Sequence, residues 1–230
     1  MLSDKAQKSL VSLLIAFATG TLLTTALVGL IPEAIESVGH HTHNIMLMIL
    51  GSLLFFFFLE KLIIWRNCPD DSCDVHGEAA GPLVLVGDAF HNLTDGVVIA
   101  AAFLTDFTIG LAVGLAIIAH EIPQETGDFG ILLHSGFSKK KAYIYNALSS
   151  SATIPSAIIS YFLLEDFALI VPYILAISAG SFLYIALSDL TPELHQRLGW
   201  KYSIKQILLI ILGIITMLLI FTIGVHSHNH

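Results

Sequence analysis

The sequence predicts an all-α, polytopic membrane protein, and three observations support that fold class. Hydrophobic residues make up 55% of the chain and charged residues only 12%, whereas about a quarter of the residues in a soluble domain are charged. The mean hydropathy is +0.82. The apolar residues gather in runs of about 20, the length that crosses a bilayer as a helix. A soluble enzyme, a nucleic-acid binder and a disordered chain are therefore excluded, and the net charge of −8 also argues against nucleic acid.

Seven apolar stretches qualify as membrane-spanning helices within one transmembrane domain, residues 1–230. The first carries scattered Thr and Gly and is followed by no clear cleavage site, so we interpret it as an anchor that stays in the membrane rather than a signal peptide. A loop at 66–81 separates the second stretch from the third. The stretches lie near 9–31, 44–65, 82–104, 107–135, 142–164, 168–191 and 204–225.

The basic residues predict the orientation of these helices. With seven spans, all ten basic residues fall on one side of the membrane, and the loops on the other side contain none. By the positive-inside rule, the N-terminus and the 66–81 loop are cytoplasmic and the C-terminus is outside. We expect a multi-pass protein of the cell membrane. The basic residues are Lys5, Lys8, Lys61, Arg66, Lys139, Lys140, Lys141, Arg197, Lys201 and Lys205.

The first and sixth stretches contain two copies of one motif. At an offset of 160 residues, Gly20 to Glu33 aligns with Gly180 to Glu193, and seven of the 14 positions are identical, including the terminal glycine and the Pro-Glu pair. With seven spans the two copies run through the membrane in opposite directions. This is the inverted-repeat signature of secondary transporters, whose sites lie near the midplane between the repeats. The third and fourth spans occupy that position in the sequence.

The third and fourth spans each carry a strongly polar face. On a helix, Asp88, Asn92 and Asp95 fall within about 60° of one another, and His91 lies one turn before Asp95. Each face costs several kcal/mol in a bilayer unless it is paired, hydrated or bound to metal. The polar residues of the fourth span are His120, Glu121, Gln124, Glu125 and Asp128.

Three interpretations of these faces stay open: hydrogen bonds between helices, a proton relay and a divalent-metal site. We favour metal, because imidazole nitrogen with carboxylate and amide oxygen at i,i+4 suits Zn²⁺, Fe²⁺ or Mn²⁺. The lack of thiolate argues against Cu⁺, and the histidines argue against Mg²⁺ and Ca²⁺. The zinc-protease motif His-Glu-x-x-His fails, because Gln124 replaces its second histidine and Pro123 lies inside it. A membrane metallohydrolase is kept as a further alternative.

These residues resemble the motifs of ZIP transporters, the Zrt- and Irt-like divalent-metal importers, over nearly the whole chain. The resemblance rests on His91-Asn92-x-x-Asp95-Gly96, on the subfamily motif HExPxExGD from His120 to Asp128, and on Gly180 to Glu193. It implies a two-metal site at mid-membrane. The implied ligands are His91, Asp95, His120 and Gln124 at the primary site, and Asn92, Asp95, Glu121 and Gln124 at its neighbour. Asp88, Glu125 and Asp128 are expected to support these ligands or to line the pathway.

The chain departs from the ZIP pattern in two places. Many family members have His or Glu where this chain has Gln124, and a neutral amide oxygen is a weaker ligand. The site is therefore expected to be less tight or less zinc-selective. The family has eight spans, and this chain begins at what would be the second. We expect a start assigned too late, or a truncation, to explain the missing helix.

The loops and the tail carry weaker signals. Cys68 and Cys73 have the spacing C-x4-C rather than C-x2-C, so an acidic turn with incidental cysteines and a low-affinity metal loop are equally compatible with them. Three histidines of an outer loop and three at the C-terminus could collect metal outside the cell, and the C-terminal three are also compatible with a disordered tail or the remnant of a tag. The histidines in question are His40, His41, His43, His226, His228 and His230.

We therefore expect a transporter that admits zinc to the cytoplasm through mid-membrane His, Asp and Glu side chains, with Fe²⁺, Mn²⁺ or Cd²⁺ as alternative ions. Its expected partners are the divalent ions and the lipid bilayer, with no nucleic acid, and a homodimer is compatible with the sequence. No enzymatic activity is expected. Alternating access would come from movement of the third and fourth spans relative to the repeat pair. The alternative from another class is a membrane sensor or regulator that binds metal without moving it.

Overall fold

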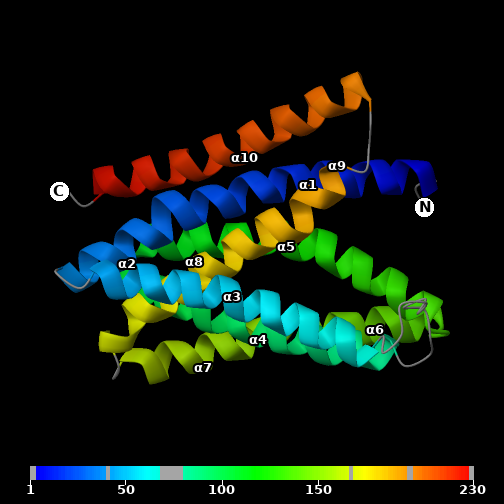
Figure 1. The fold of residues 1–230 in the computed structure, drawn as a ribbon, viewed down its shortest axis with the longest axis horizontal. Coiled ribbons are helices and arrows are strands. Elements are labelled where there is room, and N and C mark those ends of the chain that lie inside the picture. The colour runs from blue at the N-terminus through cyan, green and yellow to red at the C-terminus, as the bar shows by residue number, and fades with distance from the viewer. Residues whose placement is uncertain (1–3, 40–41, 68–79, 166–167, 196–198, 228–230) are drawn as a thin grey trace.

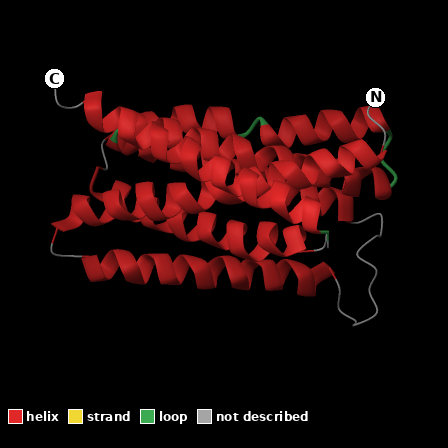
Figure 2. Ribbon diagram, turned by 90° about the horizontal axis from the view of Figure 1, so that it is seen from above, coloured by secondary structure: helices red, strands yellow, loops and turns green. Residues whose placement is uncertain are grey.

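The computed structural model describes residues 4–39, 42–67, 80–165, 168–195 and 199–227. In these parts of the chain every regular element is helical, and the long helices run side by side in one bundle (Figure 1). The view from above in Figure 2 shows the same side-by-side arrangement of helices. The start of α1 and the end of α10 lie at opposite ends of the bundle. The predicted all-α fold class is confirmed.

The N-terminal half of the bundle begins with a long interrupted helix. α1 (Asp4–Thr24) continues through a π-helical segment, η1 (Thr25–Leu30), into α2 (Ile31–Val38). Gly39 ends this run with a φ of +57°, a conformation that favours glycine. The helices α3 (Thr42–Asn67) and α4 (Ala80–Thr105) follow.

The C-terminal half contains a second helix that is interrupted by a π-helical segment, in which α8 continues through η4 into α9. A different kind of break lies earlier in this half. The predicted span at 142–164 is divided in two by a turn at Ser151 and Ala152. The elements of this half are α5 (Phe107–His134), α6 (Lys139–Ser150), α7 (Thr153–Glu165), η3 (Ala168–Ile170), α8 (Val171–Tyr184), η4 (Ile185–Leu190), α9 (Thr191–His195) and α10 (Trp200–Ser227).

Five helices or helix runs among the described residues are long and apolar enough to cross a membrane. The chain is therefore an all-α polytopic membrane protein, and each of the seven predicted stretches coincides with one helix or one run of consecutive helical segments. The count of seven crossings stays a prediction. The five runs are Leu13–Val38, Phe107–Leu133, Lys139–Leu164, Val171–His195 and Trp200–Thr222.

The two copies of the repeated motif have the same irregular backbone. η1 and η4 are both π-helical, and each residue of η4 lies 160 positions after its equivalent in η1. The amide of Ile31 bonds the carbonyl of Ala26, and the equivalent amide of Thr191 bonds the carbonyl of Ala186. Each widened turn stands just before the shared proline, whose missing N–H leaves a carbonyl free one turn earlier. The repeat seen in the sequence is thus also a repeat of local structure.

The two repeats use equivalent glycines for close helix packing. A side chain at Gly20 would collide with the Ile210 carbonyl of α10, and one at Gly180 would lie 2.7 Å from the Ser52 side chain of α3. Small residues let helix backbones approach in this way in membrane bundles. The Ser52 hydroxyl also donates to the Ile177 carbonyl at 2.7 Å. α1 therefore packs along α10 as α8 packs along α3.

A tight turn holds α4 and α5 together as antiparallel neighbours. The Asp106 side chain caps α5 by accepting from the amides of Thr108 and Ile109 at 2.7 and 3.2 Å. α4 also packs on α7, and α5 also packs on α1, so this pair occupies the middle of the bundle. Because the two helices run in opposite directions, residues late in α4 face residues early in α5.

The buried core lies between the repeat helices and the α4–α5 pair. Leu22, Val113 and Leu175 are fully buried there. The outer helix faces carry large exposed apolar side chains, such as Phe58 of α3 and Leu208 of α10. An apolar exterior of this kind is the surface that lipid covers.

Candidate metal centre

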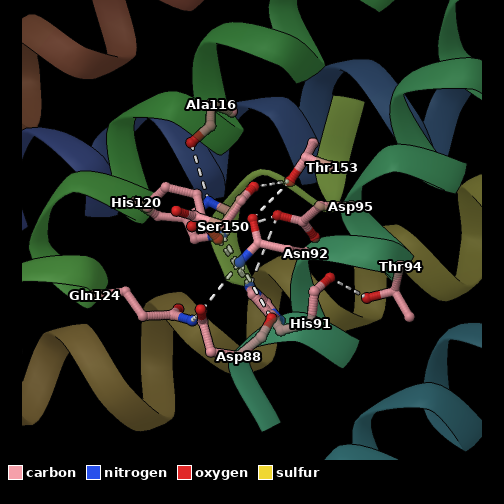
Figure 3. A network of polar contacts seen from close by, with 11 residues as sticks. Asp88, His91, Asn92, Thr94, Asp95, Ala116, His120, Gln124, Ser150 and Thr153 are labelled. Atoms are coloured by element: carbon pink, nitrogen blue, oxygen red, sulfur yellow. Dashed lines mark hydrogen bonds and ion pairs between the residues drawn. The ribbon is translucent and has the colours of Figure 1, made fainter. Parts of the chain in front are cut away.

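The polar faces of α4 and α5 meet inside the bundle. Asp88, His91, Asn92 and Asp95 come from α4, and His120 and Gln124 come from α5 (Figure 3). Glu121 follows His120 on α5. Asp88, Asn92, Asp95 and His120 are each at most 4% exposed. The helical spacing brings the α4 residues onto one side of their helix, and the Asp106 turn brings that side against α5.

Four of these side chains form a close group, called here the four-residue group: His91, Asp95, His120 and Glu121. Each offers one ligand atom, and these atoms all lie within 4.8 Å of one another. The Nε2 atoms of His91 and His120 are 3.3 Å apart. Asp95 Oδ2 lies 3.4 Å from His120 Nε2, and Glu121 Oε1 lies 3.4 Å from His91 Nε2. The other two imidazole–carboxylate distances are both 3.7 Å.

These spacings fit tetrahedral coordination of a first-row metal ion. Four N and O donors at about 2.0 to 2.2 Å from a zinc ion lie about 3.3 to 3.6 Å from one another. The separations of 3.3 to 3.7 Å given above are close to that range. Two carboxylates also supply the charge that balances a divalent cation. The five separations are therefore compatible with a divalent ion among these four donors.

The backbone fixes the tautomer of His120. Its Nδ1 lies 3.1 Å from the carbonyl oxygen of Ala116, one turn earlier in α5. A carbonyl oxygen only accepts, so Nδ1 carries the proton, and in the neutral ring Nε2 then turns its lone pair toward the group. The ring of Phe182 from α8 packs edge-on against His120 with centroids 5.9 Å apart. One face of the centre is thus closed by a repeat helix.

The two amide side chains are directed to Asp88 rather than to the four-residue group. Asn92 Nδ2 donates to the carbonyl oxygen and to Oδ1 of Asp88 at 3.1 and 3.0 Å. The Asn92 amide oxygen accepts from the Thr153 hydroxyl at 2.6 Å. Gln124 Nε2 lies 3.5 Å from Asp88 Oδ1. Asn92 and Gln124 therefore orient a carboxylate in this structure, whereas the ZIP resemblance implied that both are ligands.

A second close group, called here the oxygen group, consists of Asp88, Glu121 and Glu125. One oxygen from each lies within 4.8 Å of the others. Asp128 lies one turn further along α5, belongs to neither group and is half-buried. Glu121 is common to both groups.

Several carboxylate oxygens of the two groups are buried with no hydrogen-bond partner. An unpaired buried carboxylate oxygen is costly, and a cation is the partner that removes the cost. Among the described residues, the ring nitrogens nearest to Asp95 and Glu121 are the Nε2 atoms of His91 and His120, at 3.4 to 3.7 Å. The oxygens without a hydrogen bond are Asp88 Oδ2, Asp95 Oδ2, Glu121 Oε1, Glu121 Oε2 and Glu125 Oε1.

Residues of α6 and α7 that the motifs did not indicate complete the surroundings. Thr153 holds Asn92, and Ser156 donates to the Leu93 carbonyl at 2.6 Å. Asn146 donates to the Glu125 carbonyl at 3.0 Å. The signal available in the sequence was a run of small polar residues from Asn146 to Thr153 inside an apolar stretch.

Most of the cysteines and histidines noted in the loops and the tail lie outside the residues that the structure describes. Cys68, Cys73, His40, His41, His228 and His230 lie outside the described residues, and so does most of the 66–81 loop. His43 is described and exposed near the start of α3.

The sequence model of the ZIP zinc transporter family matches residues 1–79 and 69–221 of this chain. Zinc transporter zipt-7.2 of Caenorhabditis elegans is 37% identical over 142 residues, and human zinc transporter ZIP6 is 37% identical over 145. Each match covers 60% of this chain. Zinc transporter ZIP13 of Pongo abelii is 33% identical over 223 residues, which are 90% of this chain.

The curated relatives are longer proteins than this chain. The matched segment spans 31% of the nematode protein, 19% of the human protein and 65% of the Pongo abelii protein. The similarity to the first two thus concerns a part of each relative.

Proposed function

Because the chain belongs to the ZIP zinc transporter family, we propose that it carries zinc, or a similar first-row divalent ion, across a membrane and into the cytoplasm. The four-residue group is the proposed binding site on that path. The observation that carries the proposal is the spacing of four buried donors from two antiparallel helices, at separations that suit a tetrahedral ion. The names of the relatives, all zinc transporters, support zinc as the ion and a transporter rather than an enzyme.

The four donors replace the water that a divalent ion loses on entering the bundle. The imidazole nitrogens bind as neutral lone-pair donors, and Asp95 and Glu121 bind as anions. Before an ion arrives, the Oδ2 atom of Asp95 and both carboxylate oxygens of Glu121 have no hydrogen-bond partner. The ion therefore gains ligands that are already desolvated, and the protein gains a counter-charge for its buried acids.

Movement of the α4–α5 pair against the repeat helices is the proposed route of alternating access. The pair carries every residue of both groups, whereas α1 and α8 are each held to a partner helix through Gly20 and Gly180. The contact of Phe182 with His120 lies at the boundary between these two parts. Sliding at this boundary would expose the ion first to one side and then to the other.

The charge distribution supports the inward direction. Lys139, Lys140 and Lys141 are exposed at the start of α6, at the end of the bundle where α5 finishes. By the positive-inside rule that end faces the cytoplasm. An ion that moves from His120 toward Glu125 along α5 therefore moves toward the cytoplasm.

Metal entry into liposomes tests the proposal. The full chain is reconstituted in vesicles that contain a metal-sensitive dye, and Zn²⁺, Mn²⁺ and Fe²⁺ are added outside. We expect zinc entry in wild type and none above empty vesicles for Asp95→Ala. Glu36→Gln is the matched control, since Glu36 is exposed on α2 and belongs to neither group. Wild-type vesicles that bind zinc but admit none would favour a sensor instead.

A further inference from the structure

We propose that a cavity at the outer end of the bundle binds a small amphipathic amine, and that this occupant holds the transporter in one state. The cavity has a volume of about 850 Å³, a size that accepts drug-sized ligands. It lies beside α2, at the end of the bundle opposite to α6 and its lysines, which the positive-inside rule assigns to the outside (Figure 1). The effect on transport rests on the proposed function, whereas the binding site itself does not.

The walls of the cavity are mainly apolar and come from segments far apart in the sequence. Val38 of α2, Leu104 of α4 and Leu164 of α7 line it, together with Leu169 and Pro172 near the start of α8. Leu169 is 89% exposed, so the rim offers apolar surface that an occupant can cover. Covering such surface is favourable, and the walls therefore select a ligand with a hydrocarbon or aromatic body.

Three of the four polar side chains that line the cavity present hydrogen-bond acceptors. The Ser37 hydroxyl donates its proton to the Glu33 carbonyl at 2.9 Å, and the Thr105 hydroxyl donates to the Ala101 carbonyl at 2.9 Å. Each hydroxyl therefore has only lone pairs left for an occupant. The ionised carboxylate of Glu33 is likewise an acceptor. The polar part of the ligand should consequently be a donor.

The charge of the cavity specifies the kind of donor. Among the described residues that line it, Glu33 is the one carboxylate, and none is Lys, Arg or His. One carboxylate with two hydroxyls is a poor set for a divalent ion, which takes more anionic or imidazole ligands. It matches a protonated amine, which carries one positive charge and only donates. The Tyr173 ring, also in the lining, is a further group that attracts ammonium.

The cavity crosses the boundary between the two parts of the proposed transport mechanism. Leu104 and Thr105 belong to α4, which moves in that mechanism, whereas Glu33 and Val171 belong to the repeat helices α2 and α8. An occupant that contacts both parts gains all of these contacts only in the arrangement seen here. It therefore shifts the population of transporters toward this state and slows the transport cycle.

Three compounds with the same body and different head groups test the binding site: 3,3-diphenylpropylamine, 3,3-diphenylpropanol and 3,3-diphenylpropionate. Calorimetry measures their binding to the full chain in lipid nanodiscs, with empty nanodiscs subtracted. We expect the amine to bind about 10-fold more tightly than the alcohol, and the anion not to bind. Glu33→Gln should lower the amine affinity about 10-fold and leave the alcohol affinity unchanged, which also shows that the variant is folded. Glu36→Gln, an exposed position outside the lining, should bind all three as wild type does.

Zinc entry into vesicles tests the effect on transport. The amine added outside should slow zinc entry by wild type several-fold, and should act less on Glu33→Gln relative to that variant's own rate. A large excess of zinc should not restore the rate. Restoration by zinc would overturn the proposed effect, because the ion and the amine would then exclude each other at one site.

The binding measurements separate this inference from the proposed function. Equal binding of the three compounds, or equal amine affinity in wild type and Glu33→Gln, would overturn the site even if zinc enters the vesicles. If the amine binds as expected to a chain that admits no zinc, the site stands and the transport function is wrong.

Discussion

Two regions of the bundle differ in how they are packed: the helix pairs of the repeats, and the α4–α5 pair that holds the candidate metal centre. In the repeats, Gly20 and Gly180 bring backbones into contact, and Leu22 and Phe182, also 160 residues apart, are at most 1% exposed. In the α4–α5 pair, carboxylate oxygens are buried without a hydrogen bond. The first region gains stability from contact. The second region keeps carboxylate oxygens without hydrogen bonds, and a bound ion can supply the missing partner. Substitutions in the two regions should therefore have different consequences.

The largest expected effect comes from a change in the repeats. Gly180→Leu places a side chain where Ser52 Cβ and the Ile49 carbonyl lie 2.7 and 2.9 Å from the new Cβ. Backbone cannot move aside as a flexible side chain can, so the free energy of unfolding should fall by about 3 kcal/mol or more. Thermal unfolding in detergent measures it. Gly51→Ala on α3 is the matched control, because open space surrounds Gly51. Equal stability of the two variants would contradict the close packing.

The next effect should leave the fold intact and remove the response to zinc. Asp95→Ala deletes a buried carboxylate whose Oδ2 has no hydrogen bond, so the metal-free protein should unfold at the same temperature as wild type or higher. At about 100 times the dissociation constant, zinc should stabilise wild type by about 2.7 kcal/mol and the variant by nothing. Unfolding temperatures with and without zinc measure both. A variant as strongly stabilised by zinc as wild type would show that the ion binds elsewhere.

Acid should weaken transport without unfolding the bundle. Metal binds neutral imidazole and ionised carboxylate, so protons compete for all four ligands. Initial zinc uptake should fall several-fold when the pH on both sides of the vesicle is lowered from about 7.5 to about 5.5. Thermal unfolding at both pH values checks that the protein stays folded. Uptake that is unchanged or faster in acid would be incompatible with these ligands.

The smallest effect concerns a residue that supports the centre from α7. Thr153→Val removes the hydroxyl that donates to the Asn92 amide oxygen at 2.6 Å. The buried oxygen is then unpaired, which costs about 1 to 2 kcal/mol of stability and loosens the side chain that holds Asp88. Uptake should fall about two- to threefold, within the range of one lost hydrogen bond. Thr153→Ser should restore both properties. If the Val and Ser variants behave alike, Thr153 does not position Asn92.

The fold could be predicted because the membrane imposes a simple rule on the chain. Apolar runs of sufficient length become helices, and the helices occur where those runs lie. The hydropathy pattern does not reveal the widened turns at η1 and η4 or the break between α6 and α7. These features depend on single backbone hydrogen bonds, such as that from the Ile31 amide to the Ala26 carbonyl. The Gly20 and Pro-Glu matches did indicate that the first and sixth stretches are related.

The composition of the centre could be predicted from spacing, but its pairing could not. Helical periodicity places His91 and Asp95 on one face of α4. Such a polar face is recognisable in the sequence because ionisable residues are rare and costly within a membrane span. Which α5 residues oppose them depends on how far the two helices are offset along their axes. That offset brings Glu121 to His91 and Gln124 to Asp88. Thr153 reaches Asn92 from 61 residues away, a contact that no local pattern indicates.

X-ray absorption of the full chain loaded with one equivalent of zinc tests most directly whether the four-residue group holds the ion. Two imidazole nitrogens and two carboxylate oxygens should appear at about 2.0 to 2.2 Å, with no sulfur. The same measurement on His120→Ala should lose one imidazole. A zinc–sulfur distance of about 2.3 Å would place the ion at Cys68 and Cys73 instead. A spectrum that does not change in the His120 variant would also contradict the assignment.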